Sequence, residues 1–373
     1  MRYKTELRVN LTALKHNIYQ IRSLYPNKEL VMMAKANAYG HGDIETVSYC
    51  LENALISHIG VATLKEGLHL RQEIPSFPFE ISVFSETLLG ERKFAPYYRD
   101  FRLIPVIHTL EELKIFLEEK LYGHVPLWVK INTGMNRLGI RKAEFPQFLA
   151  ILKKYSVRSL DHLLSHFSNS QEMESDNFSY IQEKNFLEMK NLLLSENIVI
   201  AHTSMANSGS IMQKKPEFCA KECSFLRPGM SIYGGDSYQS IIPCSSFYAQ
   251  VLDRFSITKG ERVGYGKYEI TSPGTLLLLA CGYGDGPFFS FSHKKWNFFP
   301  YGEGYFWGRV SMDMMAIFFK ETVEKTLLPK QGEFFEIWGE RKGELESLAR
   351  EVGLISYVLT TGLNQRIQRV YKK

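Results

Sequence analysis

The sequence predicts an α/β protein with an N-terminal (β/α)8 TIM-like barrel and a C-terminal, predominantly antiparallel β domain. Over roughly the first 235 residues, strand-like runs alternate with helical patterns. Such alternation is typical of parallel strands joined by right-handed crossovers. Eight strand candidates within about 250 residues favour a closed barrel over an open sheet. After Ser240, short apolar and aromatic runs are separated by Gly, Pro and Lys, a texture that indicates antiparallel strands.

The predicted elements follow in chain order. Residues 4–9 form a short strand and residues 12–24 an amphipathic helix. The barrel strands are predicted at residues 30–34, 58–63, 79–84, 103–108, 126–132, 160–167, 197–204 and 225–235. Helices are predicted between them at residues 44–54, 65–73, 109–121, 143–155 and 179–196. The second domain ends with a helix at 344–352 and a strand near 366–370. These elements divide the chain into a barrel domain, 10–240, and a β domain, 241–373.

Composition and charge restrict the class of protein. The apolar share of 45% and charged share of 23% are ordinary for a globular enzyme. The net charge of +5 is mild and its lysines and arginines form no block, so we expect no nucleic-acid or membrane partner. No signal-like N-terminus and no apolar run of membrane-spanning length is present. Five cysteines without metal-type spacing indicate reduced thiols in a cytoplasmic protein without a metal site.

Lys35 is the first candidate for chemistry. It follows the apolar run 30–34, which we interpret as a buried parallel strand. An amine at the tip of such a strand loses hydration, which lowers its pKa and favours the free amine that forms a Schiff base. The alternative is a surface lysine whose stem covers apolar atoms.

Further polar residues fall where other predicted strands end. Because the carboxyl ends of barrel strands share one face, these side chains should converge on one site. Singly, His166 could be a hydrogen-bonded core histidine and Arg227 a surface residue. The converging set comprises Lys35, Lys130, Asn132, Arg137, His166, Asn207, Ser208, Arg227, Gly229 and Met230.

Several strings in this set, and others beyond it, resemble one known family. The lysine lies in AKANAYGHG (34–42), and GRVSMDMM (308–315) lies in the second domain. Together they form a specific combination that is similar to the alanine racemases. Further matching strings cover nearly the whole chain in order: INTGMNRLGI (131–140), HFSNS (166–170), HTSMANSGS (202–210), LRPGMSIYGG (226–235), VGYGKY (263–268), GYGDG (282–286) and, more weakly, SYVLTTGLNQRIQRVY (356–371).

The resemblance implies an isomerase that interconverts L- and D-alanine through an aldimine of pyridoxal 5'-phosphate and supplies D-alanine for cell-wall peptidoglycan. It also implies a head-to-tail homodimer with shared active sites, and pairing of residues 1–9 with the second domain. A serine or broad-specificity amino-acid racemase is an alternative. So are a non-catalytic pyridoxal-phosphate carrier, which would lack the β domain, and a decarboxylase on a related fold.

The resemblance also assigns roles to single residues. Lys35 would carry the cofactor and serve as one base, and Tyr265 of the partner subunit as the other. The phosphate would be held by Tyr39, Ser208, Tyr357 and the backbone N–H groups of Gly229 and Met230, with His166 and Asn207 nearby. Arg227 would face the pyridine nitrogen, and Arg137 would contact the cofactor's phenolic oxygen and the substrate carboxylate. Lys130 would carry a carbamate. Met312 and Asp313 from the partner would border substrate entry.

Some positions depart from the family pattern. Asn132 stands where aspartate is usual, Ser311 replaces a commoner cysteine, and Pro287 follows GYGDG where an aromatic is more usual. The terminal LNQRIQRVY also lacks the usual Ser-Pro-Arg pattern. These departures bear on substrate preference more than on the type of reaction.

Overall fold

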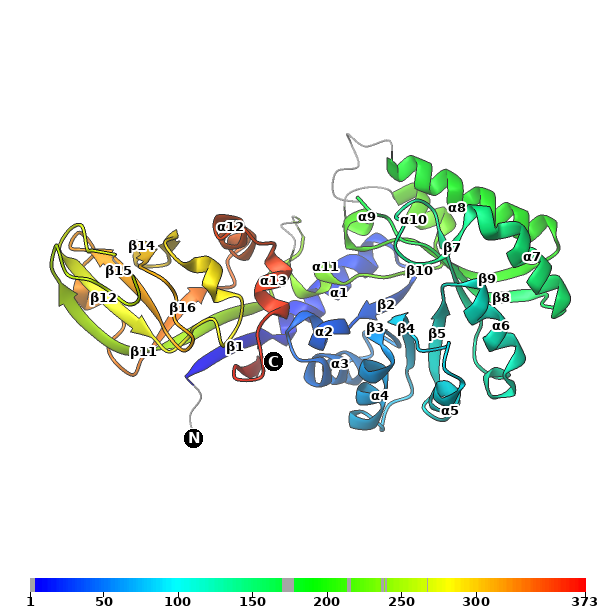
Figure 1. Ribbon diagram of the computed structural model, residues 1–373, viewed down its shortest axis with the longest axis horizontal. Coiled ribbons are helices and arrows are strands. Elements are labelled where there is room, and N and C mark those ends of the chain that lie inside the picture. The colour runs from blue at the N-terminus through cyan, green and yellow to red at the C-terminus, as the bar shows by residue number, and fades with distance from the viewer. Residues whose placement is uncertain (1–3, 170–177, 213–215, 236–237, 239, 267) are drawn as a thin grey trace. The chain divides into compact units, whose positions relative to one another are not determined.

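The computed structural model describes residues 4–169, 178–212, 216–235, 238, 240–266 and 268–373 (Figure 1). The chain divides into two compact units. The barrel unit contains Ile18–Ala38 and Asp43–Ile232. The β unit contains Met1–Asn17, Tyr39–Gly42 and Tyr233–Lys373. The short segment Tyr39–Gly42 therefore packs with sequence that lies far away along the chain.

The barrel unit is built on one parallel sheet. Its strands are hydrogen-bonded in the order β10-β2-β3-β4-β5-β6-β8-β9, and the short β7 pairs with β6. Two backbone hydrogen bonds join the ends of this path, from Ser224 N to Thr203 O (2.9 Å) and from Arg227 N to Ala206 O (3.0 Å). The sheet is therefore a nearly closed barrel. The strands are β2 (Glu29–Met33), β3 (His58–Thr63), β4 (Glu80–Glu86), β5 (Leu103–Ile107), β6 (Trp128–Asn132), β7 (Ile140–Arg141), β8 (Ser159–Leu164), β9 (Val199–Ser204) and β10 (Phe225–Leu226).

Helices surround this ring of strands (Figure 1). Two of them, α4 and α6, begin with a capping box in which a threonine and a glutamate three residues later satisfy each other's backbone N–H groups. The helices are α1 (Leu11–Leu24), α2 (Lys35–Tyr39), α3 (Asp43–Glu52), α4 (Leu64–Glu73), α5 (Ala95–Asp100), α6 (Leu110–Glu118), α7 (Phe145–Lys154), α8 (Phe178–Ser195), α9 (Ser208–Met212), α10 (Pro216–Glu222) and α11 (Met230–Tyr233).

The eighth barrel strand is shorter than predicted. We expected a strand over residues 225–235, but β10 covers only Phe225–Leu226 and α11 begins at Met230. Pro228 has no N–H to donate to a neighbouring strand, so it ends regular pairing. Its carbonyl still accepts a hydrogen bond from Met33 N at 3.1 Å. The segment thus stays beside β2 before turning into a helix.

The interior of the barrel is packed rather than open. Trp128 and His162 point into it with ring centroids 4.0 Å apart, and both are buried. Burial lowers the pKa of His162 well below its usual value, because the charged form loses hydration. The neutral imidazole Nε2 pairs with Ser204 Oγ at 2.7 Å.

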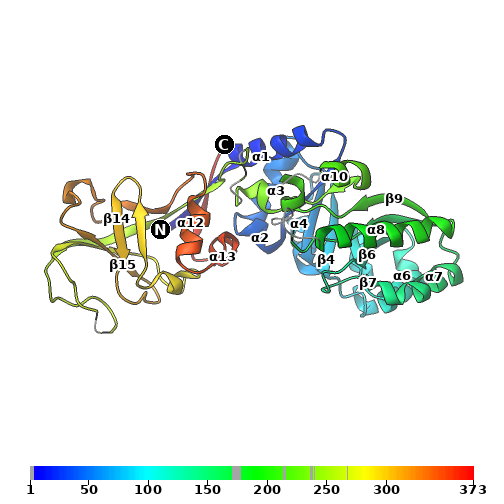
Figure 2. The ribbon, with the colours of Figure 1, turned by 90° about the horizontal axis from the view of Figure 1, so that it is seen from above.

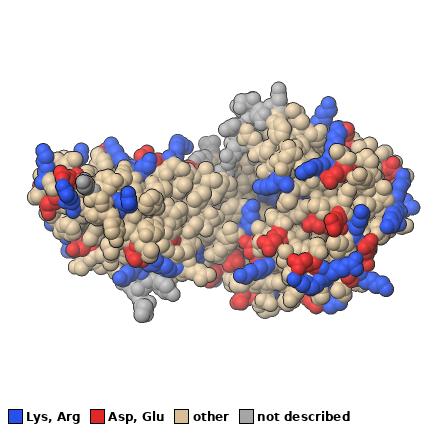
Figure 3. All heavy atoms as spheres, viewed as in Figure 1, with Lys and Arg blue, Asp and Glu red and all other residues tan. Residues whose placement is uncertain are grey.

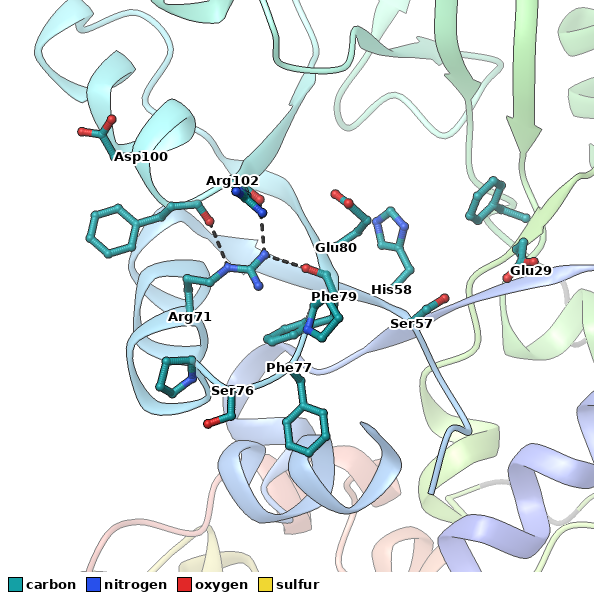
Figure 4. Close-up of a pocket in the computed structure, with 14 residues that line it drawn as sticks. Glu29, Ser57, His58, Arg71, Ser76, Phe77, Phe79, Glu80, Asp100 and Arg102 are labelled. Atoms are coloured by element: carbon teal, nitrogen blue, oxygen red, sulfur yellow. Dashed lines mark hydrogen bonds between the residues drawn. The ribbon is translucent and has the colours of Figure 1, made fainter. Parts of the chain in front are cut away.

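A hollow of about 690 Å³ lies where the barrel strands begin (Figure 4). Glu29, His58 and Glu80, the first residues of β2, β3 and β4, line it. Arg71 lies across its wall and donates hydrogen bonds to the carbonyls of Phe79, Phe101 and Arg102. Since parallel strands share direction, this hollow lies at the opposite end from residues that follow the strands.

The β unit is organised around a long strand, β11. Its sheet runs β13-β14-β15-β12-β11-β1-β17, and β16 also pairs with β11. All pairs are antiparallel except β1 with β17. Figure 2 shows β14 and β15 side by side. The elements are β1 (Thr5–Asn10), β11 (Ser245–Ile257), β12 (Gly274–Leu279), β13 (Lys295–Phe298), β14 (Gly302–Phe306), β15 (Met315–Lys320), β16 (Phe334–Trp338), α12 (Glu344–Glu351), α13 (Ser356–Thr361) and β17 (Gln368–Lys372).

Aromatic rings fill the core of the β unit. Phe247 of β11 packs against both Trp338 and Phe288, with ring centroids at 4.7 and 5.3 Å. All five cysteines of the chain are free and buried. Within the described residues, no helix combines the length and apolar character needed to cross a bilayer. The nearly closed parallel barrel and the mostly antiparallel second sheet confirm the predicted fold class.

Candidate active site

Each barrel residue proposed for the site lies in or just beyond the carboxyl end of a strand. Lys35 follows β2, Lys130 lies in β6, and His166 follows β8. Asn207 and Ser208 follow β9, and Arg227 follows β10 directly. Parallel direction brings all of these ends to one face. The set is also electrostatically coupled, because the charges of Lys35, Lys130, Arg137 and Arg227 all act on His166.

Positive charge concentrates at this face. Burial first, and then repulsion from Arg227, Arg137 and Lys35, together lower the pKa of Lys130 to about 7. Burial first and Arg137 second also lower the pKa of Lys35 from its usual value. The amines of Lys35 and Lys130 are therefore neutral at a lower pH than the amine of a surface lysine. A cluster of cations with depressed pKa values is typical of a site that binds an anion.

Arg227 connects three strand ends. This buried guanidinium donates to Ser204 Oγ and Ser165 O, and its Nη2 lies 3.4 Å from His166 Nδ1. Burial lowers its pKa to about 10, so it remains charged near neutral pH. A guanidinium has donors only. Nδ1 of His166 must therefore accept, and the neutral ring carries its proton on Nε2.

A set of hydroxyl and amide donors gathers around Ser208. Its Oγ accepts hydrogen bonds from Gly229 N (3.0 Å) and Ser231 N (3.2 Å), and the Ser231 hydroxyl lies at 3.1 Å. Ser208 and Ser231 are buried. This cluster therefore holds two hydroxyls and two backbone amides close together, and such donors suit the acceptor oxygens of a phosphate group. Ser231 was not predicted, although it lies in the LRPGMSIYGG string that contains Gly229.

The backbone after Lys35 has an unusual conformation. Ala36, Asn37 and Ala38 have φ between 51° and 54° and form a left-handed helical turn. Left-handed conformations cost residues other than glycine roughly 1–2 kcal/mol each. Asn37 Oδ1 accepts from Asp43 N at 2.9 Å, and Ala38 N donates to Ala34 O at 2.9 Å.

Glu66 of α4 also holds this turn. Its Oε1 accepts a hydrogen bond from Ala36 N at 2.8 Å. Sequence reasoning missed this contact. The spacing of Thr63 and Glu66 indicates a helix cap, but it does not indicate contact with another strand's loop.

Arg137 is carried by a turn after β6. Asn132 Oδ1 accepts from Gly134 N (3.0 Å) and Asn136 N (3.1 Å), and its Nδ2 donates to Asn136 Oδ1 at 3.2 Å. Asn136 has a left-handed φ of 56°. The asparagine that departs from the family pattern therefore shapes the loop that presents Arg137.

The β unit brings together the two tyrosines predicted to hold a phosphate. The rings of Tyr39 and Tyr357 are 6.4 Å apart, edge to face, and Tyr39 stacks on Tyr233 at 5.2 Å. Gly40 follows with φ of 86°, and a Cβ there would lie 2.0 Å from Thr360 O. Only glycine permits this approach of the 39–42 segment to α13.

The remaining predicted residues lie on the surface of the β unit. Tyr265 is 68% exposed and pairs by a backbone bridge with Arg309, while Met312 is 53% exposed. Asp313 accepts from Arg366 at 2.7 Å.

The GYGDG string packs directly against the loop that carries Met312. Gly284 N donates to Met312 O at 2.8 Å. A Cβ on Gly282 would lie 2.3 Å from the carbonyl oxygens of both Ser311 and Met312. The strings GYGDG and GRVSMDMM thus pack against each other, and their close packing requires glycine at position 282.

Comparisons with known proteins address the family. The family model "Alanine racemase, N-terminal domain" matches residues 9–237, and "Alanine racemase, C-terminal domain" matches residues 244–371. An alanine racemase from Mannheimia succiniciproducens is 30% identical over 383 residues, covering 98% of both chains.

The chain belongs to the alanine racemase family. Solved structures agree with this membership. Alanine racemase from Acinetobacter baumannii superposes over 100% of both chains with a TM-score of 0.83 at 26% identity. Alanine racemase from Bartonella henselae, solved with covalently bound pyridoxal phosphate, has a TM-score of 0.85 at 22% identity, also over 100% of both chains. Alanine racemases are isomerases that depend on pyridoxal phosphate.

Proposed function

We propose that this alanine racemase family member interconverts L- and D-alanine with pyridoxal phosphate held by Lys35. The observation that carries the proposal is the cationic face of the barrel. A lysine with a lowered pKa follows β2 beside further cations, and hydroxyl and amide donors gather around Ser208. This arrangement suits a ligand that combines an aldehyde with a phosphate. The cofactor, when bound, supplies an electron sink for the charge left on the substrate α-carbon.

The residues that would hold the cofactor follow from the donors present. Ser208, Ser231 and the amides of Gly229 and Met230 would bind the phosphate, with Tyr39 and Tyr357 contributing hydroxyls. His166 and Asn207 would line the same site. Asn207 Nδ2 lies 3.5 Å from His166 Nε2 and donates to Phe167 O at 3.2 Å.

Arg227 would face the pyridine nitrogen. Because it stays charged and can only donate, it would keep that nitrogen unprotonated and moderate the electron sink. We infer that this suppresses side reactions such as transamination. Replacing Arg227 with glutamate should raise transamination, measured as pyruvate formed from alanine. An unchanged rate would contradict this role.

Two bases are needed because racemisation removes a proton from one face of the α-carbon and returns one to the other. The Nζ of Lys35 would serve one face, and its lowered pKa favours the free amine that accepts a proton. Tyr265 of the partner subunit would serve the other face. A tyrosine acts as a base only as phenolate, so cations of the barrel face would have to stabilise it.

Arg137 would bind the substrate carboxylate by charge-assisted hydrogen bonds. Lys130 would support it as a carbamate. With a pKa of about 7, a large share of the Lys130 amine is neutral at physiological pH. A neutral amine adds carbon dioxide and releases a proton, and the resulting negative charge would offset the neighbouring cations. Carbon-13 labelled carbon dioxide should give a carbamate NMR signal that Lys130→Met abolishes.

A homodimer would complete each site. The β unit exposes the large apolar side chains of Tyr265, Tyr283, Phe289, Met312 and Met314. Exposed apolar surface of this kind is typical of an interface. We propose that it covers the barrel face of a second copy, head to tail, so that Met312 and Asp313 of the partner subunit border substrate entry. The family's role implies a cytoplasmic enzyme that supplies D-alanine for peptidoglycan.

The test combines a spectrum with an assay. Purified protein supplied with pyridoxal phosphate should show the absorbance of the lysine-bound cofactor and convert L-alanine to the D-enantiomer. Lys35→Ala should lose the absorbance and reduce the rate by at least about 10²–10⁴-fold, the usual contribution of a positioned base. Colourless protein, or alanine left optically pure, would exclude the proposal. Faster racemisation of serine than of alanine would favour the alternative racemase.

A further inference from the structure

Glu66 receives hydrogen bonds from two separate pieces of backbone. Its Oε2 accepts from Ala62 N (2.8 Å) and Thr63 N (3.0 Å) at the end of β3, where it completes the capping box of α4. Its Oε1 reaches across to β2 and accepts from Ala36 N at 2.8 Å. One half-buried carboxylate thus joins the start of a helix to the amide that follows Lys35.

We propose that Glu66 is a positioning residue for Lys35, fixing the left-handed turn that begins at the next residue. This inference rests on the proposed role of Lys35. None of the three residues in the turn with φ between 51° and 54° is glycine. Such backbone persists only where surrounding contacts enforce it. Asn37 and Ala38 hold the end of the turn through Asp43 and Ala34, whereas Glu66 holds its start.

The charge of Glu66 also acts on the lysine amine. Burial and Arg137 lower the pKa of Lys35, and Glu66 opposes both by favouring the ammonium form. The carboxylate therefore limits how far the pKa of the amine falls. A residue that only capped α4 would have no such effect. Geometry and charge thus give two separate consequences of losing Glu66.

The chain contains a matched control in α6. Glu112 closes the same kind of capping box with Thr109, and its Oε2 accepts from His108 N (2.7 Å) and Thr109 N (3.1 Å). Its Oε1 accepts from Thr87 Oγ1 at 3.2 Å, not from the lysine turn. Glu112→Ala removes a barrel helix cap of the same type, together with a second contact, so it reports what such a loss does away from the lysine turn.

The experiment compares Glu66→Ala with Glu112→Ala in the full-length protein. The first readout is hydrogen exchange of the Ala36 amide in the holoenzyme. The second is the pH midpoint for reaction of Lys35 with pyridoxal phosphate in protein freed of cofactor, located by borohydride reduction and peptide mass spectrometry. Glu66→Ala should speed Ala36 exchange by about tenfold or more, since that amide loses its acceptor. It should also move the midpoint to lower pH, and Glu112→Ala should change neither.

Glu66→Gln provides a variant of the same shape if the alanine variant does not fold. It removes the charge, so the midpoint should still fall. If Glu66→Ala and Glu112→Ala give the same Ala36 exchange or the same midpoint, Glu66 is only a helix cap and the inference is wrong. If wild-type protein does not react at Lys35 at all, the proposed function fails instead, so the two failures are distinguishable.

Discussion

At the scale of single residues, Arg227 shows why arginine and lysine are not interchangeable in this site. Its guanidinium donates to Ser204 from Nη1 and to Ser165 and His166 from Nη2, and the single nitrogen of an ammonium does not reproduce this planar fork. We expect Arg227→Lys to destabilise the fold by about 1–3 kcal/mol, because a buried acceptor loses its donor. Urea unfolding measures this cost.

A surface arginine provides the comparison. Arg92 pairs with Glu118 at 3.3 Å and its side chain is 61% exposed. Arg92→Lys should therefore change stability by less than about 0.5 kcal/mol. Equal effects of the two substitutions would show that Arg227 does not connect the strand ends.

The lowered pKa of Lys130 predicts how the stability of the fold depends on pH. Its pKa falls from 10.5 to about 7 on folding. Between these values the unfolded chain binds the additional proton, so this residue makes stability rise with pH across that window. Below about pH 7 both states are protonated and the burial penalty is complete. Lys130→Met should therefore gain more stability relative to wild type at pH 6 than at pH 9.

Carbamate formation would also change with pH, so those unfolding curves should be measured in buffer free of carbon dioxide. If the free energy of unfolding changes with pH in the same way for wild type and Lys130→Met, the lowered pKa of Lys130 is contradicted. Calorimetry at each pH gives a second measure of the same difference.

Sequence predicted these residues where a strand end and a family string coincide. Lys35 and Arg227 satisfy both conditions. Ser231 lies inside a matching string, but its hydroxyl contributes only because α11 directs it toward Ser208. The sequence indicates only that Glu66 caps the helix α4 that follows β3. It does not indicate that Glu66 also accepts a hydrogen bond from Ala36, which follows the neighbouring strand β2. Contacts between neighbouring strands depend on register, which local patterns do not specify.

At the scale of elements, the turn after β6 depends on one asparagine. Asn132 Oδ1 accepts two backbone N–H groups that aspartate could also satisfy. Asn132→Asp should therefore cost less than about 1 kcal/mol, since the Asn136 amide can turn to donate. Asn132→Ala loses both bonds and should cost about 1–3 kcal/mol. Thermal unfolding of the two variants tests this order, and the reverse order would contradict it.

The contact between the 39–42 segment and α13 gives a sharper test. Gly40 has φ of 86°, and a Cβ there would lie 2.0 Å from Thr360 O. Gly40→Ala should cost more than about 3 kcal/mol, because neither backbone can move freely. Gly90→Ala is the control, since a Cβ there meets no atom within 4 Å. Similar unfolding midpoints for both variants would contradict the close approach.

The elements also show where the sequence was insufficient. The regular alternation of strand-like and helical segments predicted the barrel, because the apolar residues of most segments follow the spacing typical of a strand or of a helix. The eighth strand was predicted too long, since apolar residues 230–233 fit strand and helix equally until Pro228 is considered. The helix α5 was not predicted, although a proline near its start is a helix signal.

At the scale of the whole molecule, the proposed sharing of active sites between two subunits makes a specific prediction. Lys35→Ala and Tyr265→Phe homodimers should each be inactive. Co-refolded mixtures should form heterodimers in which one of the two sites has both bases. With random pairing, half of the dimers are mixed, so activity should recover to roughly a quarter of wild type. No recovery, despite heterodimers shown by mass spectrometry, would place both bases in one chain.

From the sequence, the β unit could be predicted as antiparallel strands but without their order in the sheet. Its short aromatic runs indicated antiparallel strands, but their order depends on which run pairs with β11. Both β1 and β16 pair with that strand, at opposite ends of the sequence. Pairing across such separations is set by packing of rings such as Phe247 and Trp338, which no local window contains.

The parallel pairing of β1 with β17 has a consequence for synthesis in the cell. Leu7 lies opposite Arg369, and nearly the whole chain is translated between them. β1 must therefore wait for β17 to be made before the edge that faces β17 is covered. Most barrel strands can pair as they emerge, because their neighbours are close in sequence, whereas the pairing of β10 with β2 must wait until β10 is made. We expect nascent chains to complete the barrel first and to leave an open sheet edge that chaperones would bind until β17 is made.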